Sequence, residues 1–127
     1  MKEIWKDIEG YEGLYQVSNL GRVKSFPRIG THARKIKIIK IMEDRIGYKF
    51  IHLSKNNKQK RKSIHRLVAE TFIPNPNNYP CINHIDECKE NNKVNNLEWC
   101  TYSYNNNYGT KISRQREKII NNKKYRR

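Results

Sequence analysis

The segment CINHIDECKENNKVNNLEWCTYSYN, residues 81–105, carries the pattern that decides the fold. A short run at 81–83 is followed by a polar loop at 85–95, and a second, more apolar run occupies 97–101. Residues 101–108 are expected to form the start of a helix. The pattern predicts two strands and a helix, with His84 and several Asn side chains placed around them.

The polar side chains of this segment suit a metal site. Amide oxygens bind hard divalent cations, and open coordination positions can take up water and phosphate. A neutral imidazole beside the cation can accept a proton from an attacking water near neutral pH. This combination is typical of phosphodiester hydrolysis.

The preceding residues predict short strands and one helix. Period-two alternation and turn residues indicate strands at 14–18, 22–26, 35–41, 47–53 and 60–64, with turns at 19–21 and 56–58. Ser63 is expected to cap a helix over 64–72, whose apolar residues fall on one face. Pro74, Pro76 and Pro80 exclude regular structure across residues 73–80.

The charge is strongly positive and unevenly distributed. The 127 residues include 27 Lys and Arg against 12 Asp and Glu, which gives a formal net charge of +15. Residues 45–69 hold eight basic residues and no acid, whereas residues 81–109 carry a net charge of −2. This segregation favours a nucleic-acid phosphate backbone as the partner. No run approaches the roughly 18 apolar residues of a membrane span, so we expect a cytoplasmic protein with no membrane partner.

Three stretches of the chain resemble a known family. Asn83-His84-Ile85-Asp86, the run NLEWCT at 96–101 and Asn105 look like the HNH endonuclease motif, in the variant found in phage and intron-encoded homing endonucleases. IHRLVAETFIP at 64–74 resembles the lead-in that this variant carries. EIWKDIEGYEGLYQVSNLGRV at 3–23 resembles the DNA-binding module called NUMOD4.

The resemblance implies an α+β fold in three parts. These are an N-terminal antiparallel β-sheet DNA-binding module (1–62), a ββα-metal nuclease core with its lead-in helix (63–109) and a basic C-terminal tail (110–127). It also implies a phage- or mobile-element-encoded endonuclease that hydrolyses duplex DNA by nicking or double-strand cleavage. We expect it to act as a monomer in the host cell.

The resemblance also implies roles for individual residues. His84 matches the general base, and Asn96 matches the middle residue of the motif, which steadies the loop and the base. Asn83 and Asn105 match the two ligands of one Mg²⁺ or Mn²⁺ ion, although many relatives have Asp at the position of Asn83. Glu87 stands where the family usually has Gly.

We expect a further set of ten side chains, mostly on the basic strands, to contact DNA. They are Arg22, Lys24, Lys35, Lys37, Lys49, Lys60, Arg61, Lys62, His65 and Arg66. For His65, capping of the helix or contact with a phosphate is favoured over catalysis.

Two alternatives use the same residues. With Asn83 in place of Asp, the chain could be a DNA-binding protein derived from an HNH nuclease, with weak or no cleavage. Alternatively, Cys81, His84, Cys88 and Cys100 could form a structural zinc site in a nucleic-acid-binding module, which would occupy the candidate base.

Overall fold

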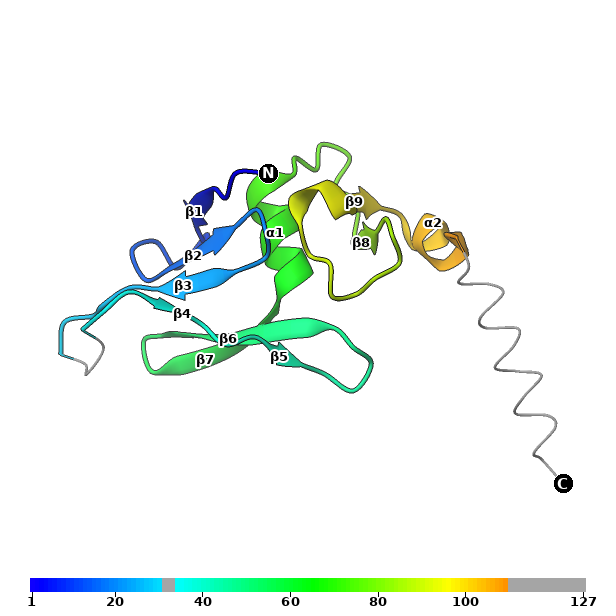
Figure 1. Cartoon of the computed structure of the whole chain (residues 1–127). Coiled ribbons are helices and arrows are strands. Elements are labelled where there is room, and N and C mark those ends of the chain that lie inside the picture. Colours follow the sequence, from blue (N-terminus) through cyan, green and yellow to red (C-terminus); the bar gives the residue numbers. More distant parts are fainter. Residues whose placement is uncertain (31–33, 110–127) are drawn as a thin grey trace, which may run out of the picture.

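The computed structural model describes residues 1–30 and 34–109, which form nine strands, two α-helices and one 3-10 helix (Figure 1). The elements are β1 (Trp5–Asp7), β2 (Tyr15–Ser18), β3 (Val23–Ser25), β4 (Lys37–Ile38), β5 (Met42–Glu43), β6 (Lys49–Lys55), β7 (Lys58–Ser63), α1 (Ile64–Phe72), β8 (Cys81–His84), η1 (Val94–Asn96), β9 (Leu97–Cys100) and α2 (Tyr102–Asn107). No helix in this described part is long and apolar enough to span a membrane. The predicted basic tail at 110–127 lies outside the described residues.

The strands form three antiparallel sheets. Strands β1 to β4 pair in sequence order, β5 to β7 form a second sheet, and β8 pairs with β9. The antiparallel α+β fold is confirmed, but the N-terminal strands divide over two sheets where a single one was expected. The second sheet contains the long basic hairpin, in which Ile51 lies opposite Lys62 and Leu53 lies opposite Lys60.

The expected strand at 35–41 is much shorter than its alternating sequence suggested. Only Lys37 and Ile38 pair with a neighbouring strand, namely β3. Both side chains are exposed, whereas Ile39 and Ile41, beyond the paired residues, are partly buried against the core. The two-residue strand β5 and the three-residue strand β1 were missed because each is too short to show a period.

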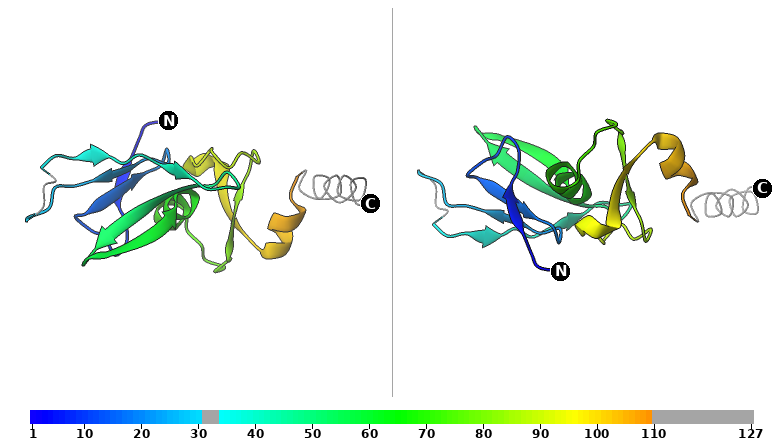
Figure 2. Two further views of the ribbon diagram at one scale, coloured as in Figure 1. Left: turned by 90° about the horizontal axis from the view of Figure 1, so that it is seen from below. Right: turned by 90° about the horizontal axis from the view of Figure 1, so that it is seen from above.

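Helix α1 is the central element of the molecule. Its side chains Ile64, Leu67, Val68 and Ala69 are buried, and it packs against β2, β6, β7, β8 and β9. Figure 2 shows the helix nearly end-on beside the β6–β7 hairpin, with the β8–β9 hairpin next to it. Each large aliphatic side chain buried here contributes roughly 2 kcal/mol. Ser63 is the N-cap residue as predicted, but its hydroxyl makes no capping hydrogen bond.

One cluster of buried side chains extends through both predicted modules. Its members come from the N-terminal sheet, the basic hairpin, α1 and the β8–β9 hairpin, and include Ile8, Tyr15, Val17, Val23, Ile51, Leu53, Ile64, Leu67, Val68, Ile82 and Leu97. Residues 1–62 and 63–109 therefore share a hydrophobic core, while the boundary between them stays a prediction.

The turn at 19–21 supports the loop that precedes η1. The backbone carbonyl of Asn19 accepts a hydrogen bond of 2.8 Å from the amide of Val94. Gly21 has a φ of +84°, and a Cβ atom added there would lie 3.2 Å from the Cβ and the carbonyl oxygen of Asn92. The absence of a side chain at 21 thus allows the turn to approach this loop closely.

We predict that Gly21→Ala destabilises the protein more than Gly13→Ala. Both glycines have positive φ, so both substitutions carry the backbone cost of about 1–2 kcal/mol, but a Cβ at Gly13 would meet nothing within 4 Å. The additional loss of unfolding free energy in Gly21→Ala reports the steric conflict between the new Cβ and Asn92. Urea unfolding of the two variants provides the test. Equal losses of unfolding free energy would contradict the close approach of residue 21 to Asn92.

Candidate active site

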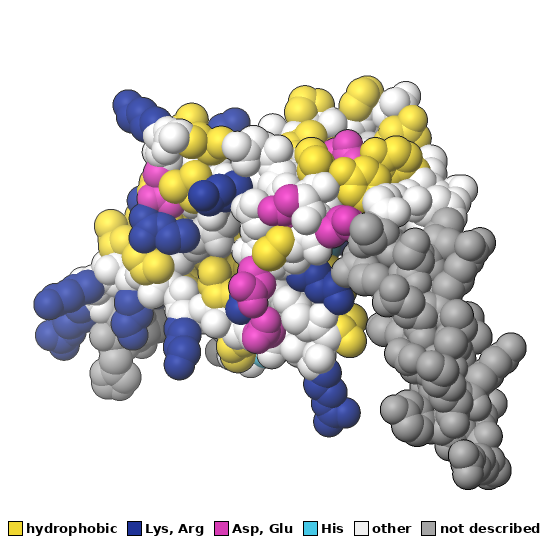
Figure 3. Space-filling view, turned by 45° about the vertical axis from the view of Figure 1, so that its right-hand side comes forward, with side chains coloured by type: hydrophobic (Ala, Val, Ile, Leu, Met, Phe, Trp, Pro, Cys, Tyr) yellow, Lys and Arg dark blue, Asp and Glu magenta, His cyan; other side chains and the backbone are white. Residues whose placement is uncertain are grey.

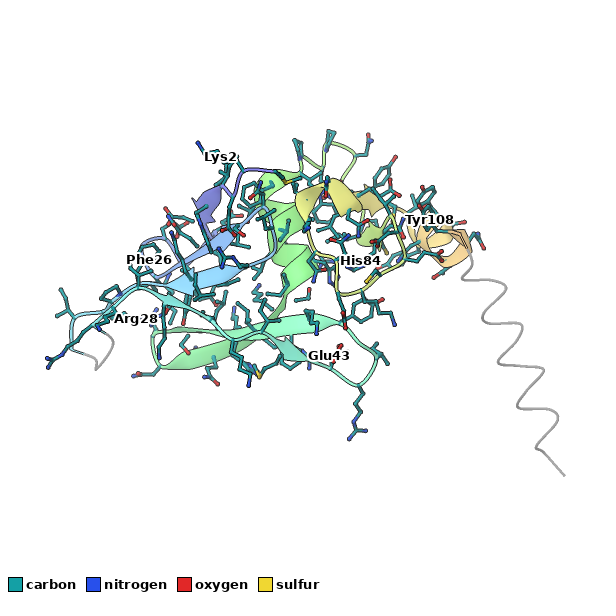
Figure 4. The ribbon with its side chains drawn as sticks, viewed as in Figure 1. Lys2, Phe26, Arg28, Glu43, His84 and Tyr108 are labelled. Carbon is teal, nitrogen blue, oxygen red and sulfur yellow. The ribbon has the colours of Figure 1, made fainter. Side chains whose placement is uncertain are left out.

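Strand β8 places two candidate residues on opposite faces of the β8–β9 hairpin. Asn83 lies opposite Glu98 and His84 lies opposite Leu97, and successive residues of a strand point to opposite sides. Asn83 therefore faces the side of α2, and His84 faces the side of α1. Figure 4 shows His84 where the β8–β9 hairpin approaches the β5–β7 sheet, far from Phe26 and Arg28.

The ring of His84 is held by Asn92. The His84 Nε2 atom lies 2.8 Å from Asn92 Oδ1, and both residues are buried. Because an amide oxygen can only accept a hydrogen bond, Nε2 carries the proton and Nδ1 has the lone pair. Asn92 had no role assigned from the sequence, because it is one of several Asn residues in a polar loop and only the folded loop brings it to the ring.

Asn96 organises the loop between the two strands. Its side-chain nitrogen donates to Asp86 Oδ1 at 2.8 Å and to the carbonyl of Asn91 at 2.9 Å, and its oxygen accepts from the amide of Asp86 at 3.0 Å. Hydrogen bonds from Asn91, from the Cys88 amide and from Asn96 hold the pKa of Asp86 below its usual value. These contacts join Asn96 to the loop, whereas the contact with the His84 ring comes from Asn92.

Asn83 is fully buried, and its amide nitrogen donates to Glu98 Oε1 at 2.9 Å. Glu98 also bonds with the hydroxyl of Tyr104 on α2, and this hydrogen bond raises the pKa of Tyr104. The bond to Glu98 fixes the orientation of the Asn83 amide. Glu98 had no assigned role in the sequence, where it is one residue of a predicted strand.

Helix α2 brings Asn105 to the same side of the hairpin. The helix begins after Thr101, whose hydroxyl accepts from the amide of Tyr104 at 3.1 Å and caps the helix. At the other end, the hydroxyl of Tyr108 donates to the carbonyl of Ile85 at 2.7 Å. Asn105 is half-buried on this helix, which packs against β8.

Glu87 occupies a position that favours glycine. Its φ is +62°, in the left-handed region, and its amide donates to the carbonyl of His84 at 2.9 Å. The backbone of this chain therefore forms the turn after Asp86 even though a non-glycine residue stands there, at a cost of about 1 kcal/mol.

The alternative zinc site is not formed. Cys81 and Cys100 face each other across the β8–β9 pair. Nevertheless, within residues 1–30 and 34–109 no three His, Cys, Asp or Glu side chains come together in a way that could hold a metal ion. The zinc interpretation of Cys81, His84, Cys88 and Cys100 was therefore wrong, since the fold does not bring these side chains together.

The basic residues predicted to contact DNA differ in their partners. Four of them form ion pairs, Arg22 with Glu3, Lys49 with Glu43 and Glu90, Arg61 with Asp44, and Arg66 with Glu70. Lys24 lies over the ring of Trp5 at 4.4 Å. Within the described ranges no ion pair is formed by Lys35, Lys37, Lys60 or Lys62. In Figure 3, Lys and Arg side chains project at the left and lower margins, while Asp and Glu gather near the middle.

His65 lies beside the candidate base. Its ring centroid is 5.1 Å from that of His84 in an edge-on arrangement. Ser63 occupies the cap of α1, so the structure gives His65 no capping position, and the ring is half-buried.

Comparison with known proteins agrees with this arrangement. The NUMOD4 motif matches residues 3–54. An uncharacterized HNH endonuclease of Acanthamoeba polyphaga mimivirus is 48% identical over 91 residues, which are 72% of this chain and 26% of that protein. The DNA endonuclease I-HmuI of Bacillus phage SP01 is 41% identical over 101 residues, 80% of this chain and 54% of that protein. The chain thus spans about a quarter to a half of the length of these curated relatives.

A solved structure shows the same fold. It is described as DNA binding and cleavage by the HNH homing endonuclease I-HmuI, and it superposes with a TM-score of 0.70 at 36% identity. The match covers 93% of this chain and 68% of the solved one. Together with the motifs and the geometry of the β8–β9–α2 unit, these similarities show that the chain belongs to the HNH homing endonuclease family and carries an N-terminal NUMOD4 motif.

Proposed function

We propose that this protein is a metal-dependent endonuclease that hydrolyses phosphodiester bonds of duplex DNA. The observation that carries the proposal is the buried pair formed by His84 and Asn92, at the end of a strand whose other face carries Asn83. A base and a candidate metal ligand are thereby placed on adjacent residues. I-HmuI, which the chain resembles, is a DNA endonuclease by name.

In the proposed reaction His84 activates water. The Nε2–H group donates a hydrogen bond to Asn92. The lone pair of Nδ1 can then accept a proton from a water molecule as that water attacks phosphorus. Asn92 keeps the imidazole in this tautomer and stabilises its orientation as positive charge develops. Cleavage of this kind, as in the family, would leave a 3′-hydroxyl and a 5′-phosphate.

The residues present fit a hard divalent cation, Mg²⁺ or Mn²⁺. Asn83 and Asn105 supply amide oxygens from β8 and α2, which pack together, and Glu98 fixes the amide nitrogen of Asn83. When bound, such an ion would polarise the scissile phosphate and stabilise the leaving oxygen. The Asn83–Glu98 hydrogen bond turns the amide so that its nitrogen points to the carboxylate and its oxygen to the opposite side.

We further propose that the two N-terminal sheets contact duplex DNA. The exposed side chains of Lys35, Lys37 and Lys60 have no acidic partner in the described structure and lie on or beside strands of these sheets. Lys62 is half-buried on the same hairpin. Antiparallel ribbons of this shape can enter a major groove, with phosphates neutralised by Lys and Arg.

A second function is favoured by one observation. Asn83 supplies no negative charge to a cation, so the chain could bind DNA and cut it weakly or not at all. A plasmid-nicking assay with Mg²⁺, Mn²⁺ or EDTA separates the two functions, because a binding protein alone shifts DNA in a gel without producing nicks. The monomeric state stays a prediction.

His84→Ala is expected to abolish metal-dependent nicking while DNA binding persists. The substitution removes the base, whose contribution is on the order of 10²–10⁴ in rate, and leaves the basic sheets intact. His52→Ala serves as the control, because His52 is exposed on β6. Nicking rates and gel shifts measured on the same DNA give the answer. Undiminished cutting by the His84 variant would refute the assignment of the base.

Asn83→Asp is expected to strengthen metal binding but to weaken the metal-free fold. It places a buried carboxylate against Glu98, where the amide now donates at 2.9 Å, at a cost of about 1–3 kcal/mol. The melting temperature of the variant in EDTA should therefore be lower than that of the wild type. The increase in melting temperature on adding Mg²⁺ should be larger for the variant than for the wild type.

The double variant Asn83→Asp with Glu98→Gln is the matched control for that experiment. The amide of Gln can donate to the new Asp, so the melting temperature in EDTA should recover. If Mg²⁺ raises the melting temperature of Asn83→Asp no more than that of the wild type, Asn83 is not a metal ligand.

Lys60→Gln is expected to weaken DNA binding uniformly across sequences. Loss of one phosphate contact lowers the slope of log affinity against log salt by about 0.9. Lys2→Gln provides the control, since Lys2 is an exposed basic residue outside the basic hairpin. Fluorescence anisotropy over a salt series measures both slopes. Identical slopes for Lys60→Gln and the wild type would exclude a phosphate contact at this residue.

A further inference from the structure

Three rings from separate elements meet beside the candidate base. The centroid of His84 on β8 lies 5.1 Å from that of His65 on α1 and 6.2 Å from that of Tyr48, which precedes β6. Tyr48 and His65 are themselves 5.4 Å apart. Each ring therefore contacts the other two, and contacts at these distances are within the range of favourable aromatic pairing.

The ring of His65 is unusual among the described residues. Its Nδ1 atom is the one buried side-chain nitrogen or oxygen there without a hydrogen-bond partner. Burial, followed by the nearby charges of His84 and Arg66, lowers the pKa of His65 to about 4. A proton on Nδ1 would be buried without an acceptor, so at neutral pH His65 is an uncharged ring.

Tyr48 is fixed from both sides. Asp44 Oδ1 accepts hydrogen bonds from the amides of Ile46 and Tyr48, at 3.0 and 2.9 Å, and this shapes the turn. On the other side, Lys89 from the β8–η1 loop donates to the carbonyl of Ile46 at 2.7 Å and places its ammonium group 4.8 Å from the centroid of the Tyr48 ring. The turn and the loop are thereby joined at the ring.

We propose that His65 and Tyr48 are positioning residues for His84 and act through ring contacts. The bond from Nε2 to Asn92 fixes one point of the imidazole, and a bond at that point does not by itself prevent rotation of the ring plane. The two neighbouring rings oppose this rotation, so the lone pair of Nδ1 keeps one direction. This inference rests on the proposed role of His84 as the base.

The position of Tyr48 gives the arrangement a further consequence. The tyrosine belongs to the turn that joins β5 to β6, in the sheet proposed to contact DNA, whereas His84 belongs to the β8–β9 hairpin. The side chains of Tyr48 and Lys89 thus connect the DNA-contacting sheet to the base. A conformational change of the β5–β6 turn would be transmitted to the orientation of the imidazole.

The test is single-turnover nicking of duplex DNA with saturating Mg²⁺ by four variants. His65→Phe and Tyr48→Phe keep a ring, and each should cleave within about threefold of the wild-type rate. His65→Leu and Tyr48→Leu replace the ring by an aliphatic side chain, and each should lower the rate constant by about tenfold or more. The dissociation constant for DNA and the Mg²⁺ concentration at half-maximal rate should stay at wild-type values.

A double-variant cycle separates positioning from a general structural role. Because His65 and Asn92 restrain the same imidazole, the effects of His65→Leu and Asn92→Ala on rate should be non-additive, whereas independent losses of stability would add. Melting temperatures confirm that each variant is folded. Should His65→Leu not fold, Tyr48→Leu in the same cycle with Asn92→Ala gives the same test.

The following results would contradict the positioning role or the assignment of the base on which it rests. Wild-type rates for both Leu variants would show that the rings do not position the base. Loss of activity in His65→Phe as well as His65→Leu would show that a ring nitrogen of His65, and not its shape, is required. If His84→Ala cuts at the wild-type rate, the assignment of His84 as the base fails. Loss of cutting in His84→Ala with full rates in the Leu variants removes only the positioning role.

Discussion

Burial of one face of α1 is the constraint on which the rest of the structure depends. Its four buried side chains contact both N-terminal sheets and the β8–β9 hairpin, so none of these parts has a complete core without the helix. Chains of this size bury a limited fraction of their surface, and a single helix shared by three sheets makes efficient use of few apolar residues. The same helix carries His65, so the packing of the core also places a ring beside the candidate base.

The site uses the geometry of a strand to separate two chemical roles. Alternation along β8 directs Asn83 toward α2 and His84 toward α1. Carboxylate and amide partners then gather on one side, and aromatic rings gather on the other. Two Asn residues four positions apart make different contacts: Asn96 donates to Asp86 within the loop, and Asn92 contacts the His84 ring.

Much of this arrangement could be predicted from the sequence, with clear physical limits. The helix at 64–72, the β8–β9–α2 unit and the turn at 19–21 follow from local patterns of apolar residues, caps and glycine. The division of the N-terminal strands into two sheets could not be predicted, because pairing depends on contacts distant in sequence. The contacts of Asn92 and Glu98 could not be predicted for a related reason. An Asn in a polar loop and a Glu in a strand meet their partners only when the hairpin has formed. The assignments of His84, Asn83, Asn96 and Asn105 stay predictions, although the fold brings their elements together.

The shared core has a consequence for how new target preferences could arise in such a protein. Exchange of residues 1–62 as a block would remove Val17, Val23, Ile51 and Leu53 from the cluster that also contains Leu67 and Leu97, so the recipient would have to repack its interior. The outward side chains of β7 are different, because Lys58 and Lys60 are exposed and leave that interior untouched. Under the proposed contact between β7 and DNA, changes of specificity are therefore expected to proceed by single substitutions of the exposed β7 side chains, while the hydrophobic interior stays unchanged.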